Sequence, residues 1–125
     1  MALLLFVDDE ADTLQMLKKG VEMYGHQAVL ASTAAEAMQQ MEAYCPDLVF
    51  VDMRLPDMDG LELLLHLQQD SKLSCFPVIV LSAGPELDAS DQALAAGARE
   101  YLLKPVRLQT LLNVINKYIP NEKQS

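Results

Sequence analysis

The stretch DLVFVDMRLPDMDG, residues 47–60, shows how this chain is organised. It begins with a short apolar run, which predicts a strand that is buried on both faces. Asp52 follows this run, and a loop rich in aspartate and proline comes next. Asp59 and Glu62 then have the spacing of a capping box, which predicts a helix over 60–69. The stretch therefore predicts a strand, a polar loop and a helix in succession.

The same alternation recurs along the chain. Short apolar runs predict strands over residues 3–7, 27–31, 47–51, 77–81 and 100–103. The segments between these runs have apolar residues at helical spacing. Strands that alternate with helices indicate βαβ units, so we expect an α/β fold with a doubly wound, five-stranded parallel sheet. In this interpretation residues 1–119 form one domain, and 120–125 form a polar C-terminal tail or the start of a linker.

Apolar stripes and capping residues mark the predicted helices. The stripes consist of Leu14, Leu17, Val21 and Tyr24; of Ala34, Ala37, Met38, Met41 and Cys45; and of Leu108, Leu111, Leu112, Ile115 and Ile119. Thr33 and Glu36 form a capping box that begins the second helix. Gly84 and Pro85 indicate where the fourth helix begins, and Gly97 indicates where it ends.

Composition narrows the classes of function. The chain has 125 residues, a size typical of one domain, and its 51% hydrophobic content is enough for a core. A net charge of −9 disfavours direct binding to nucleic acid or to an anionic membrane. Two cysteines are too few for a disulfide framework, and the apolar beginning lacks the basic leader of a signal peptide. We therefore expect a cytoplasmic protein.

Polar side chains follow four of the predicted strands. Asp8 and Asp9 follow the first, Asp52 the third, Ser82 the fourth and Lys104 the fifth. The carboxyl ends of parallel strands meet at one edge of the sheet, where doubly wound folds bind ligands. Three aspartates at this edge repel one another, and a lysine together with Mg²⁺ balances their charge. The oxygen ligands suit Mg²⁺, and the pattern lacks the cysteine and histidine spacing of a zinc site.

Such a site suits the transfer of a phosphoryl group to a carboxylate. Phosphoryl transfer depends mainly on positioning and on charge stabilisation. Asp52 can act as the nucleophile, while Lys104 and the cation hold the phosphoryl oxygens and Ser82 supplies a hydroxyl. The residues alone therefore predict a site that accepts a phosphoryl group.

Four motifs, in this order and spacing, resemble the receiver domain of two-component response regulators. They are FVDDE (6–10), VFVDMRLPDMDG (49–60), VIVLSA (78–83) and GAREYLLKP (97–105). The resemblance covers residues 3–119 and implies a flavodoxin-like (βα)5 fold with strand order 2-1-3-4-5. It implies a signalling switch and no turnover of an external substrate. A histidine kinase or phosphotransfer protein would phosphorylate the switch, which would control an output domain or effector protein.

The resemblance also implies a role for each residue of the site. Asp52 accepts the phosphoryl group, and Asp9 and Asp52 bind Mg²⁺ or Mn²⁺ directly. Asp8 acts through a water molecule, and Arg54 adds its backbone carbonyl. Every position that the family's site requires is filled in this sequence.

Further implied roles concern the phosphoryl oxygens and the response to phosphorylation. Ser82 and Lys104 contact these oxygens, and a cis peptide bond joins Lys104 to Pro105. Tyr101 holds the aromatic position of the family's switch, in which the hydroxyl moves toward the phosphate and the ring turns inward. The alternative is that this ring simply packs. The surface that changes consists of the fourth helix, the fifth strand and the fifth helix, and a phosphorylation-dependent dimer is among the implied assemblies.

Several polar residues have simpler interpretations. Asp57 and Asp59 fit a loop turn and a helix cap better than a metal site. Glu10 fits the first turn of a helix, where the helix dipole favours a negative charge. His26 and His66 lack an acidic partner at recognisable spacing and are expected at the surface.

Two other classes of function fit the predicted fold. A phosphatase with an aspartyl nucleophile would resemble this site, but such enzymes carry an aspartate two residues after the nucleophile, where this chain has Arg54. A flavin or nucleotide-binding module needs a loop after the first strand that accepts an anion, whereas residues 8–13 present carboxylates. The sequence therefore favours the phosphoacceptor function.

Overall fold

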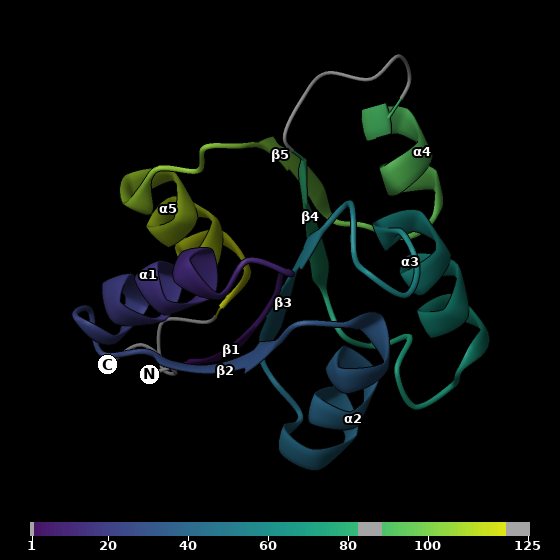
Figure 1. The fold of residues 1–125 in the computed structure, drawn as a ribbon, viewed down its shortest axis with the longest axis horizontal. Coiled ribbons are helices and arrows are strands. Elements are labelled where there is room, and N and C mark those ends of the chain that lie inside the picture. The colour runs from purple at the N-terminus through teal and green to yellow at the C-terminus, as the bar shows by residue number, and fades with distance from the viewer. Residues whose placement is uncertain (1, 83–88, 120–125) are drawn as a thin grey trace.

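The computed structural model describes residues 2–82 and 89–119, in which strands and helices alternate (Figure 1). The strands are β1 (Leu3–Val7), β2 (Gln27–Ala31), β3 (Leu48–Asp52), β4 (Val78–Ser82) and β5 (Glu100–Leu103). The helices are α1 (Ala11–Glu22), α2 (Ala34–Tyr44), α3 (Gly60–Gln69), α4 (Ala89–Ala95) and α5 (Leu108–Tyr118). The predictions for Gly84, Pro85 and the tail over 120–125 lie outside the described residues.

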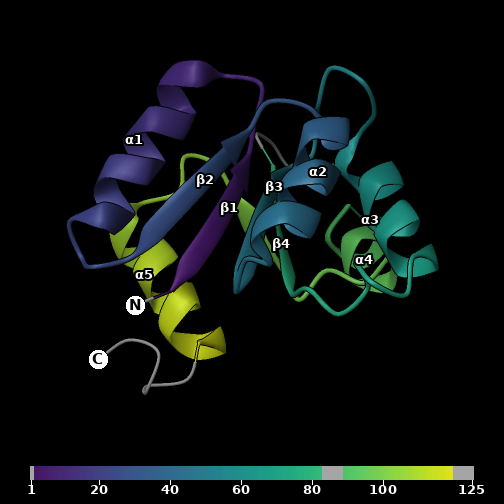
Figure 2. The same cartoon turned by 90° about the horizontal axis from the view of Figure 1, so that it is seen from below.

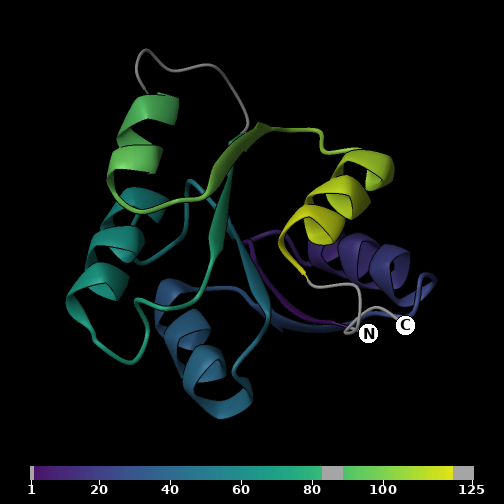
Figure 3. The same ribbon diagram turned by 180° about the vertical axis from the view of Figure 1, so that it is seen from behind.

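The strands form one parallel sheet in the order β2-β1-β3-β4-β5. Helices α1 and α5 cover one face of this sheet, and α2, α3 and α4 cover the other (Figures 1 and 3). The structure therefore confirms the doubly wound α/β fold and the expected strand order. Within the two described ranges, no helix combines the length and the apolar character needed to cross a membrane.

The sheet separates two hydrophobic cores, because successive side chains of a strand point to opposite faces. Leu5 of β1 and Val49 of β3 belong to the core under α2, α3 and α4, whereas Phe6 and Phe50 belong to the core under α1 and α5. The rings of Phe6 and Phe50 stack with their centroids 5.1 Å apart. Both β1 and β3 lie in the interior of the sheet (Figure 2), which explains why their sequences are continuous apolar runs.

Two strands lie one residue later in the chain than predicted. Both β3 and β4 include the polar residue at their ends, because Asp52 pairs with Leu81 and Ser82 pairs with Leu103 in the parallel register. At the other end of β4, Pro77 lies outside the strand, and a proline has no N–H to donate. Asp52 and Ser82 are therefore the last residues of buried strands rather than the first residues of loops.

The predicted capping residues act at three helix ends. The Thr33 side chain accepts a hydrogen bond from the Glu36 N–H at 3.0 Å, and Asp59 caps α3 in the same way. The carboxylate of Glu36 accepts from the N–H of Ser32, which lies one residue before the expected partner. Beyond α4, Gly97 has a φ of +112°, a left-handed conformation that favours glycine and ends a helix.

Two residues of the predicted apolar stripes are exposed. Tyr24 is 59% exposed, and Cys45 lies at the surface. Both residues come after the last residue of their helix, and Cys45 has a left-handed backbone with a φ of 47°. The stripe prediction is wrong at these positions, because each helix ends before its 3.6-residue period would bring the next side chain to the sheet.

His26 is buried, with 8% of its surface exposed, so the prediction of a surface histidine is wrong here. It lies in the turn between α1 and β2, and its Nδ1 accepts a hydrogen bond from the Ala2 N–H at 3.2 Å. This bond requires an Nδ1 without a proton. Burial lowers the pKa of His26 below its ordinary value of 6.5, which keeps the ring neutral.

We expect the free energy of unfolding to fall as the pH drops below about 6.5. In the unfolded chain His26 takes up a proton near pH 6.5, whereas the folded protein resists protonation until a lower pH. Stability is therefore full above pH 6.5 and falls toward the pKa of the folded state, by at most about 1.4 kcal/mol per pH unit. Urea unfolding between pH 5 and 8 measures this slope. The variant His26→Gln should lose it, and His66→Gln, at an exposed position, should keep it. Equal slopes in the wild-type protein and His26→Gln would contradict the assignment.

Candidate functional site

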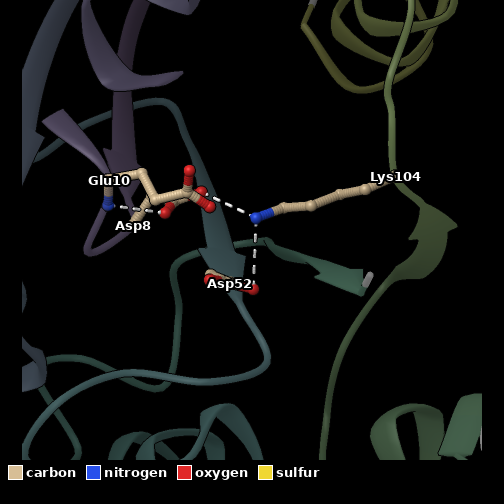
Figure 4. A network of polar contacts seen from close by, with 4 residues as sticks. All are labelled: Asp8, Glu10, Asp52 and Lys104. Carbon is tan, nitrogen blue, oxygen red and sulfur yellow. Dashed lines mark hydrogen bonds and ion pairs between the residues drawn. The ribbon is translucent and has the colours of Figure 1, made fainter. Parts of the chain in front are cut away.

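The polar residues at the strand ends gather at one edge of the sheet. Asp8 follows β1, Asp52 ends β3, Ser82 ends β4 and Lys104 follows β5. The ammonium Nζ of Lys104 lies 2.8 Å from an oxygen of Asp8 and 3.4 Å from an oxygen of Asp52 (Figure 4). One lysine therefore connects two carboxylates that come from different strands.

Backbone hydrogen bonds continue past the strands and fix these residues. The N–H of Asp8 donates to the carbonyl of Ala31 at 3.1 Å, and the N–H of Lys104 donates to the carbonyl of Ser82 at 2.6 Å. The peptide bond between Lys104 and Pro105 is cis, the isomer that the sequence resemblance implies. Because these bonds extend the sheet by one residue, the side chains at the site begin from rigid backbone.

Burial controls the charges at this edge. Asp8 is 2% exposed and Asp52 is 7% exposed. Burial raises the pKa of the Asp52 carboxyl above its ordinary value, while the positive charge of Lys104 works in the opposite direction. Burial alone would lower the pKa of Lys104, but the hydrogen bond to Asp8 and the charge of Asp52 outweigh it and raise this pKa. Lys104 is therefore positively charged at neutral pH and faces two buried carboxyl groups.

A group of carboxylates lies beside this lysine. Carboxylate oxygens of Asp8, Asp9 and Glu10 lie within 4.8 Å of one another. The Glu10 N–H donates to Asp8 at 2.9 Å (Figure 4), and the Glu10 side chain makes no hydrogen bond that caps α1. A donor set made of carboxylate oxygens fits Mg²⁺, which prefers oxygen ligands.

Sequence reasoning did not place Glu10 in this group of carboxylates. Its position before a helix favoured a role in the helix dipole, but its carboxylate lies with those of Asp8 and Asp9. Direct succession after the two aspartates was the available signal. Among the described residues Asp52 is not part of this group of carboxylates, and Lys104 links it to Asp8.

The loop between β3 and α3, residues 53–59, is held closed at its base. The Gly60 N–H donates to the Met53 carbonyl at 2.6 Å, and Arg54 forms an isolated bridge with Asp59. A Cβ at Gly60 would lie 3.0 Å from the Asp52 carbonyl oxygen, a tight contact, so this close approach favours glycine. The N–H of Arg54 also donates a hydrogen bond to the Asp52 carboxylate. Loop and carboxylate are thus directly connected.

The tip of the same loop contacts α2. Asp57 accepts hydrogen bonds from the N–H groups of Ala34 and Ala35, at 2.9 and 3.0 Å. The bond from Ala34 is the main cause that lowers the pKa of Asp57. Asp57 therefore serves a helix cap, as the sequence suggests, but the helix is a distant one. No local sequence pattern predicts a contact between residues more than twenty positions apart in the chain.

Ser82 and Tyr101 lie on neighbouring strands. Ser82 is 4% exposed at the end of β4. Tyr101 of β5 packs against the core under α2, α3 and α4, and its hydroxyl oxygen is buried without a hydrogen-bond partner among the described residues. The packing interpretation of Tyr101 thus agrees with the contacts of its ring, and its part in a switch stays a prediction.

The comparison with family models decides the class of protein. A model described as the response regulator receiver domain matches residues 4–116. The chain belongs to this family. The match contains all the strand ends described above, from Asp8 to Lys104.

Relatives and solved structures agree with the family assignment. The chain is 39% identical over 112 residues to the transcriptional regulatory protein KdpE of Mycobacterium tuberculosis, covering 90% of this chain and 48% of KdpE. It is 32% identical over 116 residues to the protein PilH of Pseudomonas aeruginosa, covering 93% of this chain and 96% of PilH. A receiver domain crystal structure from Clostridium thermocellum matches with a TM-score of 0.87 at 33% identity, over 98% of each chain. This receiver domain therefore spans about half of one relative and nearly all of another.

Proposed function

We propose that this receiver domain is a phosphorylation-dependent signalling switch and that Asp52 is its phosphoacceptor. The observation that carries the proposal is the position of the Lys104 ammonium between the buried carboxylates of Asp8 and Asp52. A carboxylate beside a fixed positive charge, at the ligand-binding edge of the sheet, is suited to act as a nucleophile in phosphoryl transfer. The family to which the chain belongs supports the same function.

In the proposed reaction, a carboxylate oxygen of Asp52 attacks the phosphorus atom of a phosphohistidine on a histidine kinase or phosphotransfer protein. The bond between phosphorus and this oxygen forms while the bond to the imidazole nitrogen breaks. The electron pair of the broken bond stays on the imidazole, which takes up a proton. Lys104 stabilises the charge of the phosphoryl oxygens, and Ser82 supplies a hydroxyl to one of them.

The residues proposed to hold Mg²⁺ or Mn²⁺ are Asp9, Asp52 and the backbone carbonyl of Arg54, with Asp8 acting through water. Glu10 adds a further carboxylate beside Asp8 and Asp9. When bound, the ion neutralises negative charge on the phosphoryl oxygens and on the carboxylates around them. Without it, a single lysine faces the acidic groups of the site, and an incoming phosphate is repelled.

Phosphorylation is proposed to act on the surface formed by α4, β5 and α5. Ser82 would move toward the phosphoryl group, and Tyr101 would turn further into the space that the serine leaves. The changed surface would control an output domain or effector protein, or form a dimer with a second copy. Residues 1–119 are the proposed unit of this switch, and 120–125 its tail or linker.

The proposal is tested with a small phosphodonor. Incubation of the protein with acetyl phosphate and Mg²⁺ is expected to add one phosphoryl group, measured as intact mass, and chelation of the metal with EDTA should prevent the addition. Mg²⁺ is required because the uncompensated carboxylates otherwise repel the donor. A purified phosphohistidine protein serves as a second donor. The proposal fails if neither donor adds a phosphoryl group, or if EDTA leaves the addition unchanged.

A further inference from the structure

Asp57 joins two segments of the chain, the loop that follows β3 and the beginning of α2. It belongs to the loop over 53–59, which begins directly after Asp52. Its two carboxylate oxygens accept from the N–H groups of Ala34 and Ala35, at the beginning of α2. Both bonds are within the normal range for a backbone N–H and a carboxylate. One exposed side chain thereby anchors the tip of the loop to a neighbouring helix.

The other contacts of this loop lie at its base or under it. The base is closed by the bond between Gly60 and Met53 and by the bridge between Arg54 and Asp59. Leu55 and Met58 pack against the core below and are partly buried. These contacts hold the loop against its own strand and helix. Among the hydrogen bonds of the described residues, the pair made by Asp57 ties the loop to α2.

The contact between Asp57 and α2 also connects the loop to the other carboxylates of the site. Helix α2 begins three residues after Ala31, the last residue of β2, whose carbonyl accepts the N–H of Asp8. A short path of backbone and hydrogen bonds therefore runs from Asp8 through the beginning of α2 to Asp57. From Asp57 it continues along the loop to Arg54, whose N–H donates to the Asp52 carboxylate. This path connects Asp8 with Asp52, two of the residues proposed to hold the metal ion.

We propose that Asp57 is a positioning residue that fixes the distance between the Arg54 carbonyl and the carboxylates of Asp8 and Asp9. This inference rests on the proposed function, because it takes these groups as the metal site. Loss of the anchor leaves the loop held only at its base, by the bridge between Arg54 and Asp59 and the bond between Gly60 and Met53, so the Arg54 carbonyl can shift relative to the carboxylates of Asp8 and Asp9. Metal affinity then falls, since a ligand that must be ordered on binding costs conformational entropy.

The simpler interpretation is that Asp57 only stabilises α2 as an N-terminal cap. Thr33 provides a matched control, because it caps the same helix by accepting from the Glu36 N–H at 3.0 Å. Removal of either side chain takes one capping group from the first turn of α2. Thr33, however, has no hydrogen bond to the loop over 53–59 in the described structure, so the two roles are separable.

The experiment compares Asp57→Ala, Asp57→Asn and Thr33→Ala in the whole chain. Titration calorimetry with Mg²⁺ alone gives the dissociation constant, and urea unfolding without metal gives the stability. We expect Asp57→Ala to raise the dissociation constant about tenfold, the lower end of the effect of removing a group that orients metal ligands. Asp57→Asn keeps one acceptor oxygen and should have an intermediate constant. Thr33→Ala should lose stability but bind Mg²⁺ as the wild-type protein does.

Each outcome separates the inference from the proposed function. Equal Mg²⁺ affinity in Asp57→Ala and Thr33→Ala, or in Asp57→Ala and the wild-type protein, overturns the positioning role. Wild-type protein that binds Mg²⁺ but gains no phosphoryl group overturns the proposed function and leaves the affinity comparison valid. Wild-type protein that binds no Mg²⁺ overturns both. Should Asp57→Ala fail to fold, Asp57→Asn decides the question by the same comparison of affinities.

Discussion

Asp52→Asn is expected to gain no phosphoryl group under conditions in which the wild-type protein gains one. The asparagine side chain has nearly the same shape but offers an amide instead of a nucleophilic carboxylate. It also removes one negative charge from the proposed metal site. Intact mass spectrometry after incubation with acetyl phosphate and Mg²⁺ measures the loss, which should be complete rather than partial.

Two controls show whether the loss of phosphoryl addition results from the missing carboxylate nucleophile. Asp12→Asn makes the same chemical change at an exposed position of α1 and should leave the phosphoryl addition intact. Metal-free Asp52→Asn should also be folded, because burial raises the pKa of Asp52 and its charged form is therefore unfavourable in the folded state. The stability that the protonated Asp52 carboxyl contributes is present at low pH. It is lost as the pH rises through the pKa of Asp52 in the folded state. Continued addition of a phosphoryl group to Asp52→Asn would show that another residue is the phosphoacceptor.

Lys104→Met is expected to slow phosphoryl addition by about a hundredfold or more, the effect of removing one fixed group that stabilises charge in a transition state. Methionine keeps the length and the apolar stem of the lysine but removes the ammonium. The same change leaves the buried Asp8 carboxylate without the cation that lies 2.8 Å away. The metal-free variant should therefore lose about 3 kcal/mol of stability, because one partner of a buried pair remains uncompensated.

The matched control for Lys104 is Lys117→Met on α5. Lys117 forms an ion pair with Glu100 at 2.9 Å, but its side chain is 63% exposed and lies on the protein surface. This variant should be phosphorylated at the wild-type rate, measured from the increase of the phosphorylated mass with time. The rate comparison is made at saturating Mg²⁺ and at a temperature at which circular dichroism shows each variant folded. A wild-type rate in Lys104→Met would exclude Lys104 from the transfer.

The pattern of apolar runs is enough to predict the fold class, whereas the strand order came from the family resemblance. Buried parallel strands must be apolar on both faces, so β1 and β3 are visible as continuous runs, and helices must bury one stripe. The chain order of strands and helices then limits the topology to a doubly wound sheet. The same reasoning places Asp8, Asp52 and Lys104 together, because each directly follows a run or ends it, and Lys104 does contact both carboxylates.

Patterns of apolar residues do not predict contacts between segments that are distant in the chain. His26 is polar and follows a glycine, yet a packed turn buries it and its ring accepts a backbone N–H from the beginning of the chain. Asp57 caps a helix that begins more than twenty residues earlier. Each outcome depends on tertiary packing, which local spacing does not contain.

The lysine of the site is carried by an edge strand. In the sheet, β5 pairs with β4 alone and has four residues, whereas Asp52 belongs to the central strand β3. Short edge elements open more readily than central ones, and such opening does not require the whole protein to unfold. Local detachment of β5 would withdraw Lys104 and leave Asp52, the proposed nucleophile, in place. The reactivity of the proposed phosphoacceptor would thus be coupled to the docking of a single short strand.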